Sequence, residues 1–167
     1  MLKLCGAALI LCAPVLFALS SYGNYVRQDR LLAAFSDTLI LSSERIRSDL
    51  TPVPALASYL EQCGPPRLRL LWKHLRRGLE QGGAELEELW HLCLIESGLR
   101  MQDLEVLEAV PRVLRSYDTE QVSRELLRMR TELEEHRREL HNQFQRNFKA
   151  QTGLQVSAAM LLLILLL

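Results

Sequence analysis

The feature that most constrains this chain is a charge-free apolar end that directly follows an amphipathic helix pattern. Before that end, apolar side chains and one histidine recur at steps of three and four residues: Val122, Leu126, Met129, Leu133, His136, Leu140 and Phe144. This spacing is typical of a helix that lies along partner helices. From Val156 to Leu167 no residue is charged, and the run closes on leucines. A water-soluble fold gains little from such a run, whereas a lipid bilayer accepts it.

Charge divides the chain into three parts. The sequence has 20 basic and 20 acidic residues, so its balance gives no reason to expect a nucleic-acid partner. Lys3 is the single charged side chain before Arg27, and none follows Lys149. The pattern predicts an N-terminal transmembrane helix at 1–22, a helical domain at 23–152 and a C-terminal transmembrane segment at 153–167.

The first apolar run also has the length of a secretory signal peptide. The best candidate for a cleavage site, Ala18-Leu19-Ser20, is a weak one. The basic region that precedes the apolar run of a signal peptide is also weak here, because Lys3 is its only basic side chain. A second apolar run at the far end makes an uncleaved anchor the more economical interpretation. The alternative is a membrane-anchored helical adaptor whose domain lies outside the cytoplasm.

Basic residues beside the two apolar runs predict the orientation. Arg27 and Arg30 follow the first run, and Arg146 and Lys149 precede the second. The two apolar runs predict a two-span protein of the cell membrane. Positive residues favour the cytoplasmic side of a membrane, so these four residues predict which side the middle domain occupies. Its middle domain is then cytoplasmic and both termini lie outside.

Prolines and glycines divide the middle domain into short helices. Thr51 is expected to cap a helix whose first position is Pro52, with Pro54 in the same turn. Further breaks are expected at Gly64-Pro65-Pro66, Gly82-Gly83, Gly98 and Pro111. Asp118 is expected to cap the last helix, and Gln121 can complete the capping box. No strand pattern is present, so the predicted fold is an all-α antiparallel helical bundle.

The sequence carries no pattern of an enzyme or a cofactor site. Its four cysteines lack metal or redox spacing. Glu88 and His91 match one E-x-x-H half of a di-iron site, but no second copy exists. One predicted helix has a basic face, which consists of Arg69, Lys73, Arg76 and Arg77. This face could touch lipid headgroups or an acidic partner, but a face that is simply solvated is the simpler interpretation.

Several of these residues, in order along the whole chain, resemble the stage III sporulation protein AB family. The most specific match is Thr51-Pro52-Val53-Pro54-Ala55-Leu56, which begins five residues after Ile46. Residues 2–7, Leu-Lys-Leu-Cys-Gly-Ala, resemble the family's start. Asp118 and Gln121 at the last helix, and the apolar tail, complete the likeness.

The resemblance implies a membrane component of the channel complex that joins mother cell and forespore in endospore-forming bacteria. It implies a helical domain similar to those of platform proteins in type II secretion and type IV pilus machines, on the mother cell side. Its partners would be other membrane proteins of the channel complex, the lipid bilayer and a cytoplasmic secretion-type ATPase, stage III sporulation protein AA.

A platform of this kind should meet its ATPase at the end of the domain farthest from the bilayer. We expect that end to consist of the turns around Gly64, Gly98 and Asp118, where a cluster of charged side chains would form the contact. The candidates are Arg67, Arg69, Arg100, Asp103 and Arg115.

Overall fold

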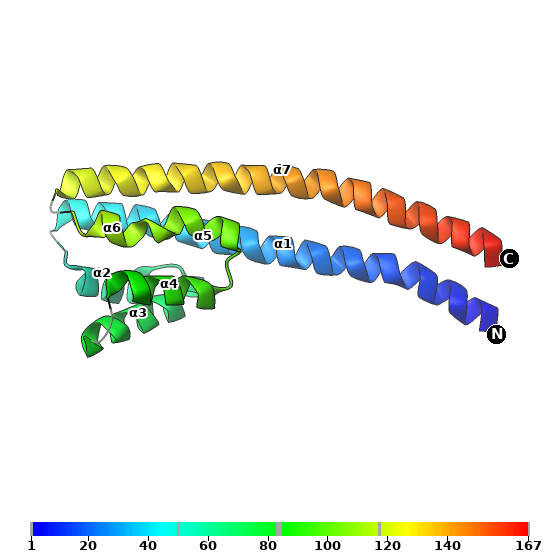
Figure 1. The fold of residues 1–167 in the computed structure, drawn as a ribbon, viewed down its shortest axis with the longest axis horizontal. Helices are drawn as coiled ribbons and strands as arrows, with labels where there is room; N and C mark the ends of the chain where they lie inside the picture. The colour runs from blue at the N-terminus through cyan, green and yellow to red at the C-terminus, as the bar shows by residue number, and fades with distance from the viewer. Residues whose placement is uncertain (1, 50, 83–84, 117, 167) are drawn as a thin grey trace. The chain divides into compact units, whose positions relative to one another are not determined.

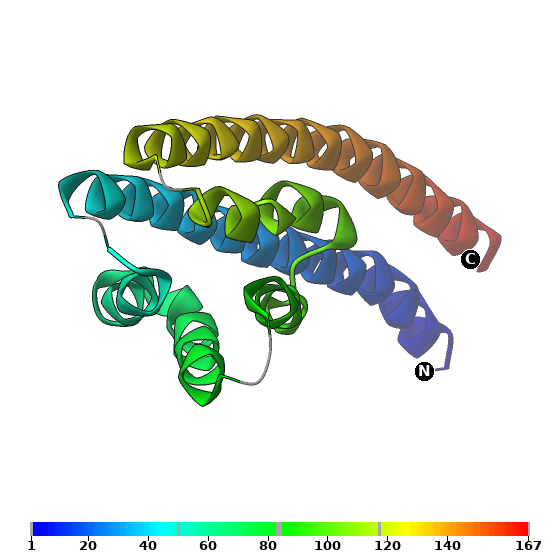
Figure 2. The same cartoon turned by 60° about the vertical axis from the view of Figure 1, so that its left-hand side comes forward.

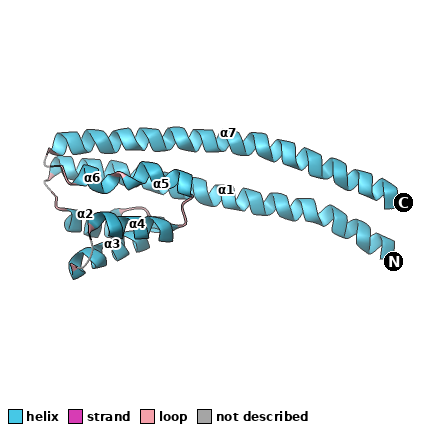
Figure 3. Cartoon of the chain, viewed as in Figure 1, coloured by secondary structure: helices cyan, strands magenta, loops and turns pink. Residues whose placement is uncertain are grey.

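The fold is built from helices alone within the residues that the computed structural model describes, which are 2–49, 51–82, 85–116 and 118–166 (Figures 1 and 3). The all-α prediction is therefore confirmed for these residues. The elements in chain order are α1 (Leu2–Ser48), α2 (Val53–Cys63), the short 3-10 helix η1 (Pro66–Leu68), α3 (Arg69–Gln81), α4 (Leu86–Ser97), α5 (Met101–Glu108), α6 (Val110–Leu114) and α7 (Thr119–Leu166).

The chain divides into two compact units. One, here called the helical body, is Arg30–Arg137, and the other, the terminal unit, combines Met1–Asp29 with Arg138–Leu167. The long helices α1 and α7 contribute residues to both units.

The core of the helical body comes from apolar stripes on α1 and α7, and the sequence spacing predicts the stripe on α7. On α7 the buried stripe is Val122, Leu126, Met129 and Leu133, and on α1 it is Leu31, Leu32, Phe35, Leu39 and Ile46. Both helices hold their apolar faces out of water, which is the dominant favourable contribution to folding.

Helices α2, α3 and α4 are packed in sequence order, with α2 against α3 and α3 against α4. A Cβ placed on Gly78 of α3 would lie 2.7 Å from Cδ2 of Leu89 on α4, so the glycine permits a close approach of the two helices. Buried Trp90 donates a hydrogen bond of 2.8 Å from Nε1 to the carbonyl of Leu107. This bond fastens α4 to α5.

The start of α2 corrects one detail of the predicted break. Pro52, not Thr51, is the N-cap, because the Pro52 carbonyl accepts the first helical hydrogen bond from the amide of Leu56 at 3.0 Å. Pro54 lies in the first turn, where its missing amide proton costs nothing. The Thr51 hydroxyl instead donates to the carbonyl of Asp49 at 3.0 Å.

The other predicted helix ends agree more closely with the structure. Asp118 caps α7, since its Oδ1 accepts the amides of Glu120 at 3.0 Å and Gln121 at 3.2 Å. Gln121 takes part through its backbone amide. Gly82 and Gly98 close α3 and α4 with φ of 66° and 79°, in the left-handed region that glycine adopts without strain.

The predicted membrane segments concern the two ends of the chain. Over the described residues, none of the helices offers an apolar stretch of the length that crossing a bilayer requires. The predictions for 1–22 and 153–167 fall mainly on residues whose side chains lie outside the described part.

Candidate partner-binding surface

The turns of the helical body gather at two ends, not at one. The end of α1, the starts of α2 and α7 and the residues after α6 surround a cavity of about 160 Å³, lined by Ile46, Thr51, Pro52, Val53, Leu56, Leu114, Ser116, Thr119 and Val122. Helix α2 runs away from this cavity, α3 returns and α4 runs away again (Figures 1 and 2). The turns at Gly64 and Gly98 therefore lie at the opposite end from Asp118. The prediction of a single end that holds all three turns is wrong, because successive short helices alternate in direction.

Three of the predicted contact residues share the end with the Gly64 and Gly98 turns. Arg67 lies in η1, Arg69 begins α3 and Arg100 is the N-cap of α5. All three side chains are exposed. Among the described residues no ion pair engages them. These arginines can therefore offer their positive charge to an approaching anion.

Asp103 is not part of any surface, which corrects the prediction that it helps form the contact. It is 0% exposed, and its Oδ1 lies 2.8 Å from Nε2 of His136 on α7. The pair links α5 to α7 inside the helical body. The sequence held a signal for this, because Asp103, Leu107 and Val110 recur at helical spacing on one face, and both apolar residues are buried.

Arg115 is exposed but already paired. Its guanidinium Nη2 lies 2.7 Å from Oε2 of Glu87 on α4, and Arg115 follows α6 at the end with the cavity. The structure therefore separates it from Arg67, Arg69 and Arg100.

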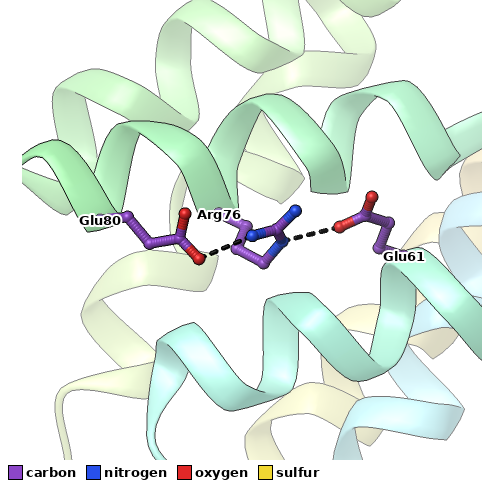
Figure 4. Close-up of polar contacts among 3 residues, drawn as sticks. All are labelled: Glu61, Arg76 and Glu80. Carbon is purple, nitrogen blue, oxygen red and sulfur yellow. Dashed lines mark hydrogen bonds and ion pairs between the residues drawn. The ribbon is translucent and has the colours of Figure 1, made fainter.

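Arg76 is partly buried where α2 packs against α3, and it does not belong to a free basic face. Its Nε donates to Glu61 of α2 at 2.8 Å and its NH1 donates to Glu80 of α3 at 2.6 Å (Figure 4). The hydrogen bond from Arg76 lowers the pKa of Glu61 below its ordinary value, and the bonds to both carboxylates raise the pKa of Arg76. Of the predicted basic face, Arg69, Lys73 and Arg77 remain for other contacts.

Exposed apolar side chains on α3 and α4 were missed by the sequence analysis. Leu70 is 67% exposed, Leu92 is 57% exposed and Ile95 is 51% exposed. The signal was available, since none of them falls on the buried stripes of its helix.

The histidines and the buried cysteine of α3 and α4 could in principle serve catalysis or metal binding, but both histidines already contact carboxylates. His91 Nδ1 lies 3.1 Å from Glu108, and His74 Nδ1 lies 3.1 Å from Glu96. Burial raises the pKa of the Cys93 thiol to about 11, so it stays protonated at neutral pH and is a poor nucleophile. Across the described part of the chain, no three His, Cys, Asp or Glu side chains come together as a metal site would need.

Comparison with known proteins gives one family and one fold. The family model described as Stage III sporulation protein AB matches residues 3–167. A solved structure titled Stage III sporulation protein AB (SpoIIIAB) is similar with a TM-score of 0.60 and 16% identity, and covers 71% of this chain and 96% of that one. No curated protein matches. At this identity the structural likeness concerns the fold.

Proposed function

Because the chain belongs to the Stage III sporulation protein AB family and so has a role related to sporulation, we propose that it is a non-enzymatic membrane platform. In this role it is part of the mother cell–forespore channel and docks a cytoplasmic secretion-type ATPase, stage III sporulation protein AA. The membrane holds its terminal unit, and the helical body faces the mother cell cytoplasm. Within the channel it also contacts other membrane proteins.

The observation that carries the docking proposal is the exposed set Arg67, Arg69 and Arg100 at the end of the helical body opposite Asp118. Because α7 begins at Asp118, the proposal rests on the exposure and charge of these arginines and no longer on their expected distance from the bilayer. Exposed charges at the rim of an interface steer association and set its salt dependence. Arginine also suits this task because its planar guanidinium can bind a carboxylate with two parallel hydrogen bonds. We therefore expect these arginines to bind an acidic surface of the ATPase. Buried Asp103 and paired Arg115 are not part of the proposed contact.

The membrane proposal is supported by the terminal unit. Leu16, Leu19, Leu154 and Leu161 are each between 63% and 76% exposed, an unfavourable arrangement in water. In the same unit Tyr25 stacks on Phe144 with ring centroids 4.2 Å apart. Aromatic side chains next to apolar segments are typical of the membrane–water interface.

Charge reversal tests the docking proposal. Full-length chain carrying Arg67→Glu and Arg69→Glu should bind the purified ATPase at least tenfold more weakly at low salt, with unchanged helical content. A control reverses Arg124 and Arg128, which are also exposed but lie on α7 and pair with neighbouring glutamates. Equal affinity of the two double variants for the ATPase would remove this end of the helical body from consideration.

Thiol labelling separates the proposed topology from the alternative, an adaptor whose domain lies outside the cytoplasm. Gln81 is exposed at the end of α3, so Gln81→Cys offers a reactive site once Cys5, Cys12 and exposed Cys63 are replaced by Ser. Buried Cys93 stays unreactive because its pKa is raised to about 11. An impermeant maleimide should label Gln81→Cys only after the membrane is permeabilised. Labelling in intact cells would support the adaptor.

A further inference from the structure

The exposed apolar side chains of the helical body are concentrated on one pair of helices. Among its described residues, four large hydrophobic side chains are exposed, and three of them are Leu70 of α3 and Leu92 and Ile95 of α4. The fourth is Leu127 of α7. Clustered exposed apolar residues with a polar surround are typical of protein interaction sites.

The register of α3 and α4 places these residues on a common outer face. The helices run antiparallel, with Gly78 beside Leu89 and His74 bonded to Glu96 at 3.1 Å. At about 100° per residue, the side of α3 opposite buried Trp72 and Leu75 presents Leu70, Lys73 and Arg77. The side of α4 opposite buried Trp90 and Leu94 presents Glu88, Leu92 and Ile95. These six residues are here called the α3–α4 face.

The two halves of the α3–α4 face carry opposite charge. Lys73 and Arg77 make the α3 half cationic, and Glu88 makes the α4 half anionic, with exposed Glu85 beside it. A partner must therefore present an acidic strip, an apolar centre and a basic strip in that order. A second copy of this chain presents this order when it is rotated by 180° about an axis that runs along the helices.

We propose that the α3–α4 face binds the same face of a second copy of this chain. Each α3 then lies over the partner's α4, so Arg77 meets Glu88, and Leu92 packs near the two-fold axis. Such an isologous contact is self-complementary and closes at two copies. It is independent of the ATPase contact, which uses the arginines around the Gly64 turn.

The size of the face predicts a weak dimer. Helices of 13 and 12 residues are about 18–20 Å long, and two of them side by side present roughly 400 Å² to a partner. A total of roughly 800 Å² falls below a standard stable interface. Two copies held in one bilayer are confined to a thin layer, which raises their effective concentration and favours the contact.

Disulfide cross-linking in membranes tests the contact where it would operate. Full-length chain with Cys5, Cys12 and Cys63 replaced by Ala is reconstituted into phosphatidylcholine vesicles without any ATPase, and Leu92→Cys is oxidised. The matched control is Leu127→Cys, which reports random collision from another exposed leucine. Leu92→Cys should form at least fivefold more cross-linked dimer. Equal cross-linking at the two positions would overturn the proposal and leave the face to a different protein.

Charge exchange tests the arrangement itself. In the antiparallel register Arg77 lies at nearly the height of Glu88, so the two meet across the proposed two-fold axis. Arg77→Glu and Glu88→Lys, each in the Leu92→Cys chain, should lower cross-linking about fivefold. The combined variant restores opposite charges in both contacts and should recover most of the yield. No recovery would overturn the α3-over-α4 arrangement. Failure of ATPase docking leaves these yields unchanged, since the vesicles contain no ATPase.

Discussion

Helix α7 contains two regions whose apolar side chains have opposite surroundings. In the helical body, Val122, Leu126 and Leu133 are at most 3% exposed. In the terminal unit, Leu154 is 76% exposed and Leu161 is 69% exposed. The contrast cannot come from helix propensity, since leucine favours helix equally in both places.

The difference shows that leucine can suit two environments, the core of a protein and a membrane. In the helical body Val122, Leu126, Met129 and Leu133 recur at steps of three and four, so they form a stripe that other helices cover. In the last residues of the chain leucines follow one another without polar interruption, so every side of the helix is apolar. A helix that is apolar all round needs an apolar environment on every side, which is the physical basis for proposing a membrane.

The largest expected difference between the two regions is in stability. Leu126→Ala should lower the free energy of unfolding by about 3 kcal/mol, because a fully buried leucine leaves a cavity. Leu161→Ala should change it by less than about 0.5 kcal/mol, since surface substitutions have small effects. Urea unfolding of the full chain in mild detergent, followed by tryptophan fluorescence, reports on the helical body because both Trp72 and Trp90 lie in it.

Equal destabilisation by Leu126→Ala and Leu161→Ala would contradict the comparison. It would mean that the end of α7 stabilises the helical body through contacts of its own, and that its exposed leucines have protein partners.

Two histidines of α7 sharpen the same comparison. His136→Ala removes the polar side chain that lies 2.8 Å from the fully buried Asp103 carboxyl group and should cost about 2 kcal/mol, because a buried polar group loses its nearest partner. His141→Ala is the matched control in the terminal unit, where exposed His141 bonds the Tyr25 hydroxyl at 2.5 Å. The same fluorescence assay should show a change below about 1 kcal/mol for this control. Similar decreases in the free energy of unfolding for both variants would show that the buried Asp103–His136 contact stabilises the fold no more than an exposed one.

Much of the fold could be predicted from the sequence because its signals are local. Gly82, Gly98 and Asp118 mark helix ends through their own backbone or side chain, and the structure places ends at all three. The break at Thr51-Pro52 was also found, but its N-cap was displaced by one residue. Which of two adjacent residues caps a helix depends on small differences in hydrogen bonding, which spacing alone does not resolve.

The candidate site was harder to predict because it depends on contacts between distant segments. Asp103 looks like a surface carboxylate until α7 brings His136 to it. Arg76 looks like one of several cations on α3 until α2 brings Glu61 within 2.8 Å. Leu92 and Ile95 count as core residues by type, and only their angular position on α4 places them outside. Burial and pairing of such residues follow from packing, not from local pattern.

The smallest expected effect concerns acid sensitivity in the helical body. The Ser36 hydroxyl donates to Oε1 of Glu134 at 3.0 Å, joining α1 to α7, and Arg130 lies 3.1 Å from the same oxygen. The Ser36 bond is the main cause that lowers the pKa of Glu134 below its ordinary 4.5. A lowered carboxyl pKa adds stability that is complete above the ordinary value and disappears as pH falls through the folded-state value.

Ser36→Ala should therefore reduce stability at pH 7 by about 0.5–1 kcal/mol, a modest amount because Glu134 is partly exposed and screened by solvent. The deficit should shrink below pH 4.5, where the unfolded carboxyl also becomes protonated. Ser48→Ala is the control, since its hydroxyl donates to the carbonyl of Glu44, which does not titrate. Urea unfolding between pH 3 and pH 7 measures both variants. A Ser36→Ala deficit that stays constant over this range would show that the hydroxyl contributes through packing and not through the charge of Glu134.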